Sequence, residues 1–234
     1  MTSTTLWVSE LFGPTVQGEG ASTGRPAMFL RTGHCPLRCS WCDTRYTWDW
    51  SLYSHKVEVR PMDVHEVWSA LSAAGAELPT PLLVVTGGEP LLQREALLIV
   101  VESARREGWR VEVETSGVIE PGCLVGKVDL FTVSPKLANS GMPARRRLKI
   151  STLREFVGLT DHVFKFVVRH PSELEEVEAI VADVSPKSVV IQPEATDNVS
   201  LAERSRILVE PVIRRGWTLG TRLHITLWGD ERGR

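Results

Sequence analysis

Residues 33–44 read GHCPLRCSWCDT, and three cysteines lie within eight positions of this stretch, namely Cys35, Cys39 and Cys42. The fourth cysteine of the chain, Cys123, is far away in the sequence. Thiolates are soft ligands that suit zinc or an iron–sulfur cluster. A structural zinc site needs a fourth ligand, which the adjacent His34 could supply, whereas a four-iron cluster on three cysteines keeps one iron open. The spacing predicts a metal centre and leaves both kinds open.

The sequence around this stretch predicts alternating strands and helices. Short apolar runs predict strands at 27–30, 82–85, 111–113, 130–133, 163–168, 189–191 and 224–227. Helical spacing predicts helices over 63–74, 94–107, a segment that starts at a capping pattern of Ser172 and Glu175, and 201–209, with Pro211 ending or kinking the last one. Such alternation favours an α/β fold with a parallel sheet, either open or closed into a full or partial (β/α) barrel.

Unusual motifs follow five of these predicted strands. They are RTGHCPLRC (31–39), TGGEP (86–90), ETSG (114–117), SPK (134–136) and QPEA (192–195). The loops after parallel strands converge on one face of a sheet or barrel, which is where such folds place their active sites. The sequence therefore predicts one shared site built from these loops. Glu112 and Glu114 alternate with valines along a predicted strand, which a solvated or barrel-lining face explains.

The composition is that of one ordinary globular domain over residues 1–234. The chain is 42% hydrophobic and carries a formal net charge of −2, so no basic field predicts nucleic-acid binding. We expect the run Arg145 to Arg147 to be solvated. The first residues lack the features of a signal peptide and no apolar run is long enough to span a bilayer, so we expect a cytoplasmic protein without a membrane partner.

The motifs resemble those of a known enzyme superfamily. C-x3-C-x2-C with Trp41 before the last cysteine, followed by GGEP at 87–90, resembles the radical S-adenosylmethionine (radical SAM) enzymes. TVQGEG (15–20), ETSG, VSPK and IQPEA extend the similarity over about residues 9–229 to the 7-carboxy-7-deazaguanine synthase family. The resemblance implies a partial TIM-like barrel with its active site at the carboxyl ends of the strands, and it favours the [4Fe-4S] cluster over zinc.

The resemblance also implies the residues that hold the cofactors. Cys35, Cys39 and Cys42 would bind the cluster. The expected contacts to S-adenosylmethionine are Trp41, Cys42, Asp43, Gly88, Glu89, Ser134, Pro135, Lys136, Gln192, Pro193, Glu194 and Ala195. Thr44 would be the protein ligand of Mg²⁺, a hard cation that keeps several waters and binds substrate oxygens.

The implied substrate is 6-carboxy-5,6,7,8-tetrahydropterin. A 5′-deoxyadenosyl radical would take hydrogen from C6, the ring would contract to 7-carboxy-7-deazaguanine and ammonia would leave, on the route to queuosine and related 7-deazapurines. The expected substrate contacts are Val16, Gln17, Gly18, Glu19, Arg31, Thr86 and His224. Arg31 offers a planar fork that suits a carboxylate. The implied partners are a second copy of the chain in a homodimer and an external electron donor, a flavodoxin or a ferredoxin.

Two regions depart from the family pattern. The tail, about 217–234, ends in RLHITLWGDERGR rather than shortly after an HKY-type segment, and we expect it to contribute to the site. Tyr46, Trp48, Trp50 and Tyr53 follow Thr44, and they favour a small satellite core over a lid. Two alternative functions stay open on the sequence: a radical SAM enzyme that activates a protein, as glycyl-radical activating enzymes do, and a non-enzymatic zinc-binding module.

Overall fold

The structure is a computed structural model that describes residues 4–159 and 161–234. Its strands are β1 (Thr5–Val16), β2 (Pro26–Thr32), β3 (Arg60–Asp63), β4 (Leu82–Gly87), β5 (Arg110–Thr115), β6 (Leu130–Val133), β7 (His162–Val168), β8 (Val189–Pro193) and β9 (Thr218–Leu219). Its α-helices are α1 (His55–Glu58), α2 (Val64–Ala74), α3 (Arg94–Arg106), α4 (Ala144–Arg147), α5 (Ile150–Val157), α6 (Leu174–Val184), α7 (Asn198–Arg214) and α8 (Leu223–Trp228). Short 3₁₀ turns are η1 (Gly20–Ser22), η2 (Arg45–Thr47), η3 (Pro90–Gln93), η4 (Gly122–Leu124), η5 (Ala138–Ser140) and η6 (Pro171–Glu173).

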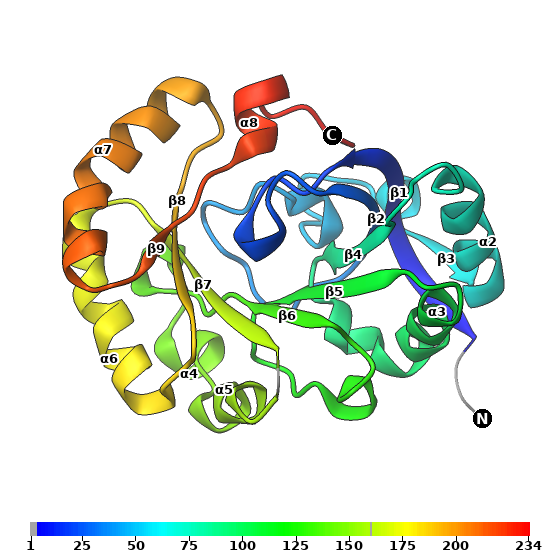
Figure 1. Cartoon of the computed structure of the whole chain (residues 1–234), viewed down its shortest axis with the longest axis horizontal. Coiled ribbons are helices and arrows are strands. Elements are labelled where there is room, and N and C mark those ends of the chain that lie inside the picture. Colours follow the sequence, from blue (N-terminus) through cyan, green and yellow to red (C-terminus); the bar gives the residue numbers. More distant parts are fainter. Residues whose placement is uncertain (1–3, 160) are drawn as a thin grey trace.

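The strands form one curved sheet in the order β3-β1-β2-β4-β5-β6-β7-β8-β9. From β2 to β9 every neighbouring pair is parallel, whereas β1 is antiparallel to both β2 and β3. Because β3 and β9 stand at the two ends of this order, the barrel is incomplete. Figure 1 shows the sheet wrapped around a central space with α2, α3, α6 and α7 on its outer side, and the C-terminus beside β1. The predicted partial (β/α) barrel is confirmed.

The two faces of the strands differ in chemistry because side chains alternate between them. Outward-facing residues such as Leu83, Val113 and Phe164 pack under the helices in the main core. The inner face has only small apolar clusters, around Phe29 and around Val163. Polar inward residues appear toward the carboxyl ends of the strands, and they are Arg31, Thr86, Glu112, Glu114, Thr132, Lys165 and Gln192. The apolar bottom of the barrel thus supports a polar upper half.

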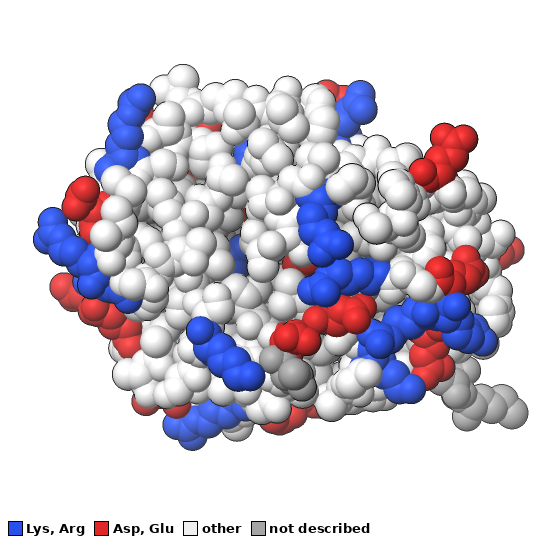
Figure 2. All heavy atoms as spheres, viewed as in Figure 1, with Lys and Arg blue, Asp and Glu red and all other residues white. Residues whose placement is uncertain are grey.

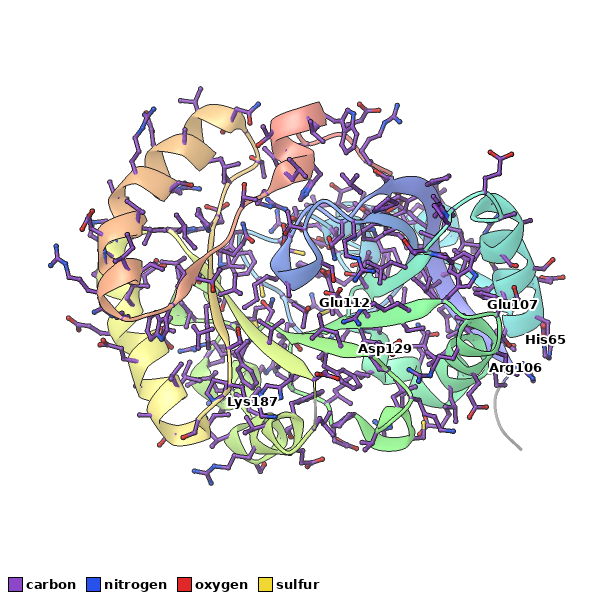
Figure 3. The ribbon with its side chains drawn as sticks, in the orientation of Figure 1. His65, Arg106, Glu107, Glu112, Asp129 and Lys187 are labelled. Carbon is purple, nitrogen blue, oxygen red and sulfur yellow. The ribbon has the colours of Figure 1, made fainter. Side chains whose placement is uncertain are left out.

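Glu112 illustrates the interior of the barrel. Figure 3 shows it on β5 inside the curved sheet, while Glu107 and His65 lie at the outer edge. Its side chain is fully buried, and Oε1 accepts a hydrogen bond of 2.7 Å from the Thr132 hydroxyl. Burial raises the pKa of Glu112, and the nearby Glu114 raises it further. Of the two explanations that the sequence left for Glu112, the structure supports a barrel-lining position.

Several local expectations are wrong, each for a physical reason. Residues 224–227 belong to helix α8 rather than to a strand, and only Ile225 of that helix is buried. Pro171 starts a 3₁₀ turn that His170 caps, so α6 begins at Leu174 without a cap from Ser172. Helix α7 starts earlier than expected, where Asp197 accepts from the backbone of Ser200, and it continues to Arg214, so Pro211 does not end it.

Two further features escaped the sequence analysis. The long strand β1 was not expected, because its pattern is broken by Gly13-Pro14 and its pairing with β2 contains two register shifts. Arg147 is buried rather than solvated, and it forms a 2.6 Å ion pair with Glu176.

None of the described helices combines the length and apolar character that crossing a bilayer requires. On the face drawn in Figure 2, basic and acidic side chains are interspersed, both along the edges and right of the centre.

The packing between sheet and helices predicts a large loss of stability when one core ring is removed. Phe164 on β7 is fully buried and lies 6.4 Å from the ring of Phe166. We expect Phe164→Ala to lower the free energy of unfolding by about 3–5 kcal/mol, through lost burial and the cavity left behind. Val199→Ala, at a side chain that is 68% exposed, should change it by less than about 0.5 kcal/mol. Urea denaturation followed by circular dichroism measures both, and equal effects would contradict the layered core.

Candidate active site

One cavity of about 510 Å³ occupies the polar half of the barrel. The predicted site residues that line it are Val16, Gln17, Gly18, Glu19, Arg31, Cys35, Cys39, Trp41, Cys42, Asp43, Thr44, Thr86, Gly88, Ser134, Lys136, Gln192, Pro193, Glu194 and His224. Three others, Glu89, Pro135 and Ala195, do not line it. The loops that the sequence analysis expected to converge do meet around one space.

The three cysteines lie on the loop after β2, and a glycine makes room for it. A Cβ added to Gly88 would collide with the carbonyl group of His34 and would lie 3.2 Å from the Cβ of Cys35. The GGEP loop therefore approaches the cysteine loop as closely as it does only because Gly88 has no side chain. The indole N–H of Trp48 donates to the Cys42 sulfur at 3.3 Å. Hydrogen bonds to ligand sulfurs are one means by which proteins tune a cluster.

These residues fit an iron–sulfur cluster. All three cysteines are free thiols and line the same cavity. Burial raises the pKa of the Cys35 and Cys39 thiols, and the neighbouring cysteines raise it further, so binding of a metal centre must displace protons. Within the described ranges, no set of three His, Cys, Asp or Glu side chains is arranged around a single metal ion. A four-iron cluster does not need such a set, because each cysteine binds a different iron.

The zinc alternative depended on His34 as a fourth ligand. His34 does not line the cavity with the cysteines, and its Nε2 lies 3.0 Å from Nε2 of His55. Trp7 and Trp50 pack edge-on against the His34 ring. The histidine is therefore part of an aromatic cluster on the outer side of the loop, and the geometry supports the cluster over zinc.

The residues expected around S-adenosylmethionine fall into two groups. Gln192 is 1% exposed and lines the cavity, and neither its amide oxygen nor its nitrogen has a hydrogen-bond partner among the described residues. A buried amide without partners is costly, so a polar ligand at this point would satisfy it. In contrast, Glu89 is buried outside the lining, and its carboxylate accepts from the hydroxyl of Thr115 and the backbone N–H of Ser116.

The opposite wall carries the QGEG loop. The Gln17 amide donates to Glu114 at 3.1 Å, and the Thr86 hydroxyl donates to the same carboxylate at 2.8 Å. A Cβ on Gly18 would collide with the imidazole of His224. The absence of a side chain at Gly18 therefore allows helix α8 to lie against the QGEG loop, and brings His224 into the cavity wall.

A buried charge network joins these walls. Glu19 accepts from Lys165 and from Arg222, each at 2.6 Å. Arg222 also bonds the Asp43 carboxylate and the carbonyl of Ala195. Burial alone would raise the pKa of Glu19, but Lys165 and Arg222 outweigh it and hold that pKa well below its ordinary value. The network links the QGEG loop, the cysteine loop and the segment before α8.

Sequence reasoning missed Lys165 and Arg222. The signal for Lys165 was a single cation within the apolar run VFKFVV, and Arg222 had no signal beyond its place two residues before His224.

The aromatic residues after Thr44 were expected to form a satellite core. Tyr46, Trp48 and Tyr53 line the cavity instead, so this segment forms part of its wall.

Arg31, on β2, lines the same cavity. Its Nε donates to Glu10 at 2.6 Å, and its guanidinium lies 5.4 Å from the ring of Phe12. Glu10 and Arg31 are paired across β1 and β2 in the sheet register. An arginine held by one nitrogen at a cavity wall can offer its remaining N–H groups to a carboxylate.

Comparisons with known proteins agree with this geometry. Residues 29–130 match the model of the Radical SAM superfamily. The 7-carboxy-7-deazaguanine synthase of Pyrobaculum aerophilum is 37% identical over 97% of this chain and 96% of its own length. That of Halobacterium salinarum is 32% identical over 96% of this chain and 91% of its own. The crystal structure of QueE from Escherichia coli has a TM-score of 0.73 at 27% identity, covering 94% of this chain and 95% of that one.

The matches to these three proteins extend over nearly the full length of both partners, and the superfamily model covers the loop that carries the three cysteines. The chain belongs to the 7-carboxy-7-deazaguanine synthase family of radical SAM enzymes.

Proposed function

We propose that the chain converts 6-carboxy-5,6,7,8-tetrahydropterin into 7-carboxy-7-deazaguanine with loss of ammonia, in the biosynthesis of queuosine or related 7-deazapurines. One observation carries the proposal. The QGEG loop and the three cysteines, which are separated in sequence by the whole of β2, line the same cavity. A radical source and a family-specific substrate loop therefore share one space.

The cysteine side of the cavity would hold the cofactors. Cys35, Cys39 and Cys42 would ligate a [4Fe-4S] cluster, and the unpartnered amide of Gln192 would bind a polar part of S-adenosylmethionine. Bound together, these groups supply one-electron chemistry that produces a carbon radical. The protein residues orient the cofactors and exclude water. The ring of Trp41 is fixed for that role, because its N–H donates to Asn139 at 3.0 Å and Lys136 lies 5.4 Å from the ring.

The opposite side would hold the pterin. Arg31 would bind the carboxylate, and Gln17, Glu19 and His224 would contact the ring system. Fixed charges in a water-excluded site orient a substrate at little cost in reorganisation. The ion pairs of Glu19 with Lys165 and Arg222 keep this wall rigid.

Thr44 would bind Mg²⁺ in the same proposal. Its side chain lines the cavity, and its hydroxyl lies 3.6 Å from the Cys42 sulfur. A hydroxyl oxygen is a hard ligand, and Mg²⁺ commonly completes its shell with waters and substrate oxygens. The proposal also retains a homodimer, an external flavodoxin or ferredoxin as electron donor, and a cytoplasmic location.

The position of the C-terminal tail favours a small molecule over the alternative protein substrate. Residues of the tail, Asp230 to Arg234, contribute to its lining. A peptide loop of a protein substrate would need a more open approach to the cysteines.

A single anaerobic turnover assay tests the function. Reconstituted protein with S-adenosylmethionine, reductant and the carboxylated tetrahydropterin should give 7-carboxy-7-deazaguanine, read by mass spectrometry. Cleavage of S-adenosylmethionine with unchanged pterin would leave the radical enzyme but overturn the substrate. No cleavage by protein with a verified cluster would overturn both.

Thr44→Ala tests the magnesium site. Removing the protein oxygen should weaken Mg²⁺, so that half-maximal stimulation of turnover requires at least roughly tenfold more Mg²⁺. Thr44→Ser keeps the oxygen and should behave within about twofold of the parent. The visible absorption of the cluster should be the same in all three proteins, which separates loss of Mg²⁺ from damage to the cysteine loop. An unchanged Mg²⁺ dependence in Thr44→Ala would contradict the assignment.

A further inference from the structure

The last residues of the chain are tied across the cavity mouth by one side chain. We call Gly229 to Arg234 the C-terminal strap. Arg232 donates through Nε to Glu10 Oε1 at 2.6 Å and pairs through Nη1 with Glu58 Oε2 at 2.8 Å. Its guanidinium also lies 3.8 Å from the centre of the Tyr46 ring. Arg232 therefore fastens the strap to β1, α1 and η2 at once.

Glu10 connects the strap to Arg31. One oxygen of Glu10, Oε2, accepts from Arg31 at 2.6 Å and from the Tyr46 hydroxyl at 2.9 Å, while the other oxygen accepts from Arg232. The Glu10 side chain is 13% exposed and does not line the cavity, whereas Arg31 does. The carboxylate thus lies behind the arginine that faces the ligand. With both arginines in place, its negative charge is divided between two cations.

The bonding of Arg31 leaves it available to a ligand. Across residues 4–159 and 161–234, its guanidinium donates a hydrogen bond only through Nε, to Glu10. Its two terminal amino groups remain for a ligand carboxylate. If Arg232 were absent, Glu10 would keep its full charge for Arg31 and would also repel a carboxylate bound nearby.

We propose that Arg232 is a positioning residue for the substrate: by pairing with Glu10 when the C-terminal strap is closed, it leaves Arg31 free to bind the substrate carboxylate. This rests on the proposed function, because it assumes a carboxylated pterin. The strap can release at this end. The Arg232 side chain is 43% exposed, and ion pairs with such access to water are weak. Arg222, only 10% exposed, anchors the segment before α8, and Gly229 makes the bend between α8 and the strap at φ 70°.

Arg232→Gln is the direct test. We expect KM for the carboxylated tetrahydropterin to rise about tenfold, with kcat within about twofold, because the change removes binding rather than chemistry. A second readout avoids turnover. Calorimetry with S-adenosylmethionine but no reductant compares 6-carboxypterin with pterin, and the preference for the carboxylated compound should fall by a similar factor.

Removing the charge on Glu10 distinguishes positioning from a simple latch. In the Glu10→Gln background the carboxylate that is hydrogen-bonded to Arg31 is gone, so adding Arg232→Gln should change KM by less than about twofold. A latch that only closes the mouth is itself fastened to β1 through Glu10, so Glu10→Gln alone should raise KM if Arg232 is only a latch, whereas positioning predicts a KM no higher than that of the parent. Arg232→Lys keeps the charge and should recover part of the loss.

Arg215→Gln is the matched control. It breaks an ion pair of 2.8 Å with Glu178 on the outside of the barrel, and Arg215 does not line the cavity. Its KM should equal that of the parent. Thermal unfolding should show that all variants are folded.

The possible results separate the two levels of inference. A parent enzyme that does not convert the pterin overturns the proposed function and this inference with it. A parent that converts it, combined with an unchanged KM in Arg232→Gln or with additive effects of the Glu10 and Arg232 changes, overturns the inference alone.

Discussion

The structure depends on the parallel pairing of strands from β2 to β8, which turns alternate side chains inward and brings all carboxyl ends to one rim. Along β2 this gives Ala27, Phe29 and Arg31 in succession on the inner face, and along β7 it gives Val163 and Lys165. The inward-facing side chains nearer the amino ends of the strands are apolar and fill the bottom of the incomplete barrel. The upper ones are polar and form the cavity. A shift of any strand by one residue would exchange these faces, so core and site are specified by the same register.

Placing charges inside the barrel has a cost that the structure meets by pairing. An isolated buried ion is strongly unfavourable, and removal of one member of a buried pair typically costs about 3–5 kcal/mol. Glu19 has two cationic partners, and Arg222 has partners on three segments of the chain. Because these segments are remote in sequence, the network acts as a set of cross-links. It fixes the QGEG loop relative to the cysteine loop, which a site with separate cofactor and substrate walls requires.

The sequence was sufficient for the parts of the molecule that depend on local patterns. Several of the parallel strands from 82–85 to 189–191 are nearly continuous apolar runs, and the motifs after them fall at the rim as expected. The sequence was insufficient where contacts between residues that are distant along the chain determine the structure. The strand β1 has an irregular pattern and is held by pairing with β2 and β3. Lys165 and Arg222 each form an ion pair with Glu19, and no local pattern in the sequence indicates an ion pair between residues that are 146 and 203 positions apart.

The structure of the C-terminal tail also depends on contacts with residues that are distant along the chain. From sequence, RLHITLWGDERGR differs from the family's usual ending, and the run 224–227 suggested a strand. In the structure it forms a short helix whose position is set by contact of His224 with Gly18, followed by a strap that reaches β1. Two of the three arginines of this segment lie in different environments: Arg222 is buried at the centre and Arg232 is exposed at the rim. Because Arg222 ties the loops of Glu19 and Asp43 together inside the barrel, the proposed release of Arg232 at the rim would leave the cofactor wall in place.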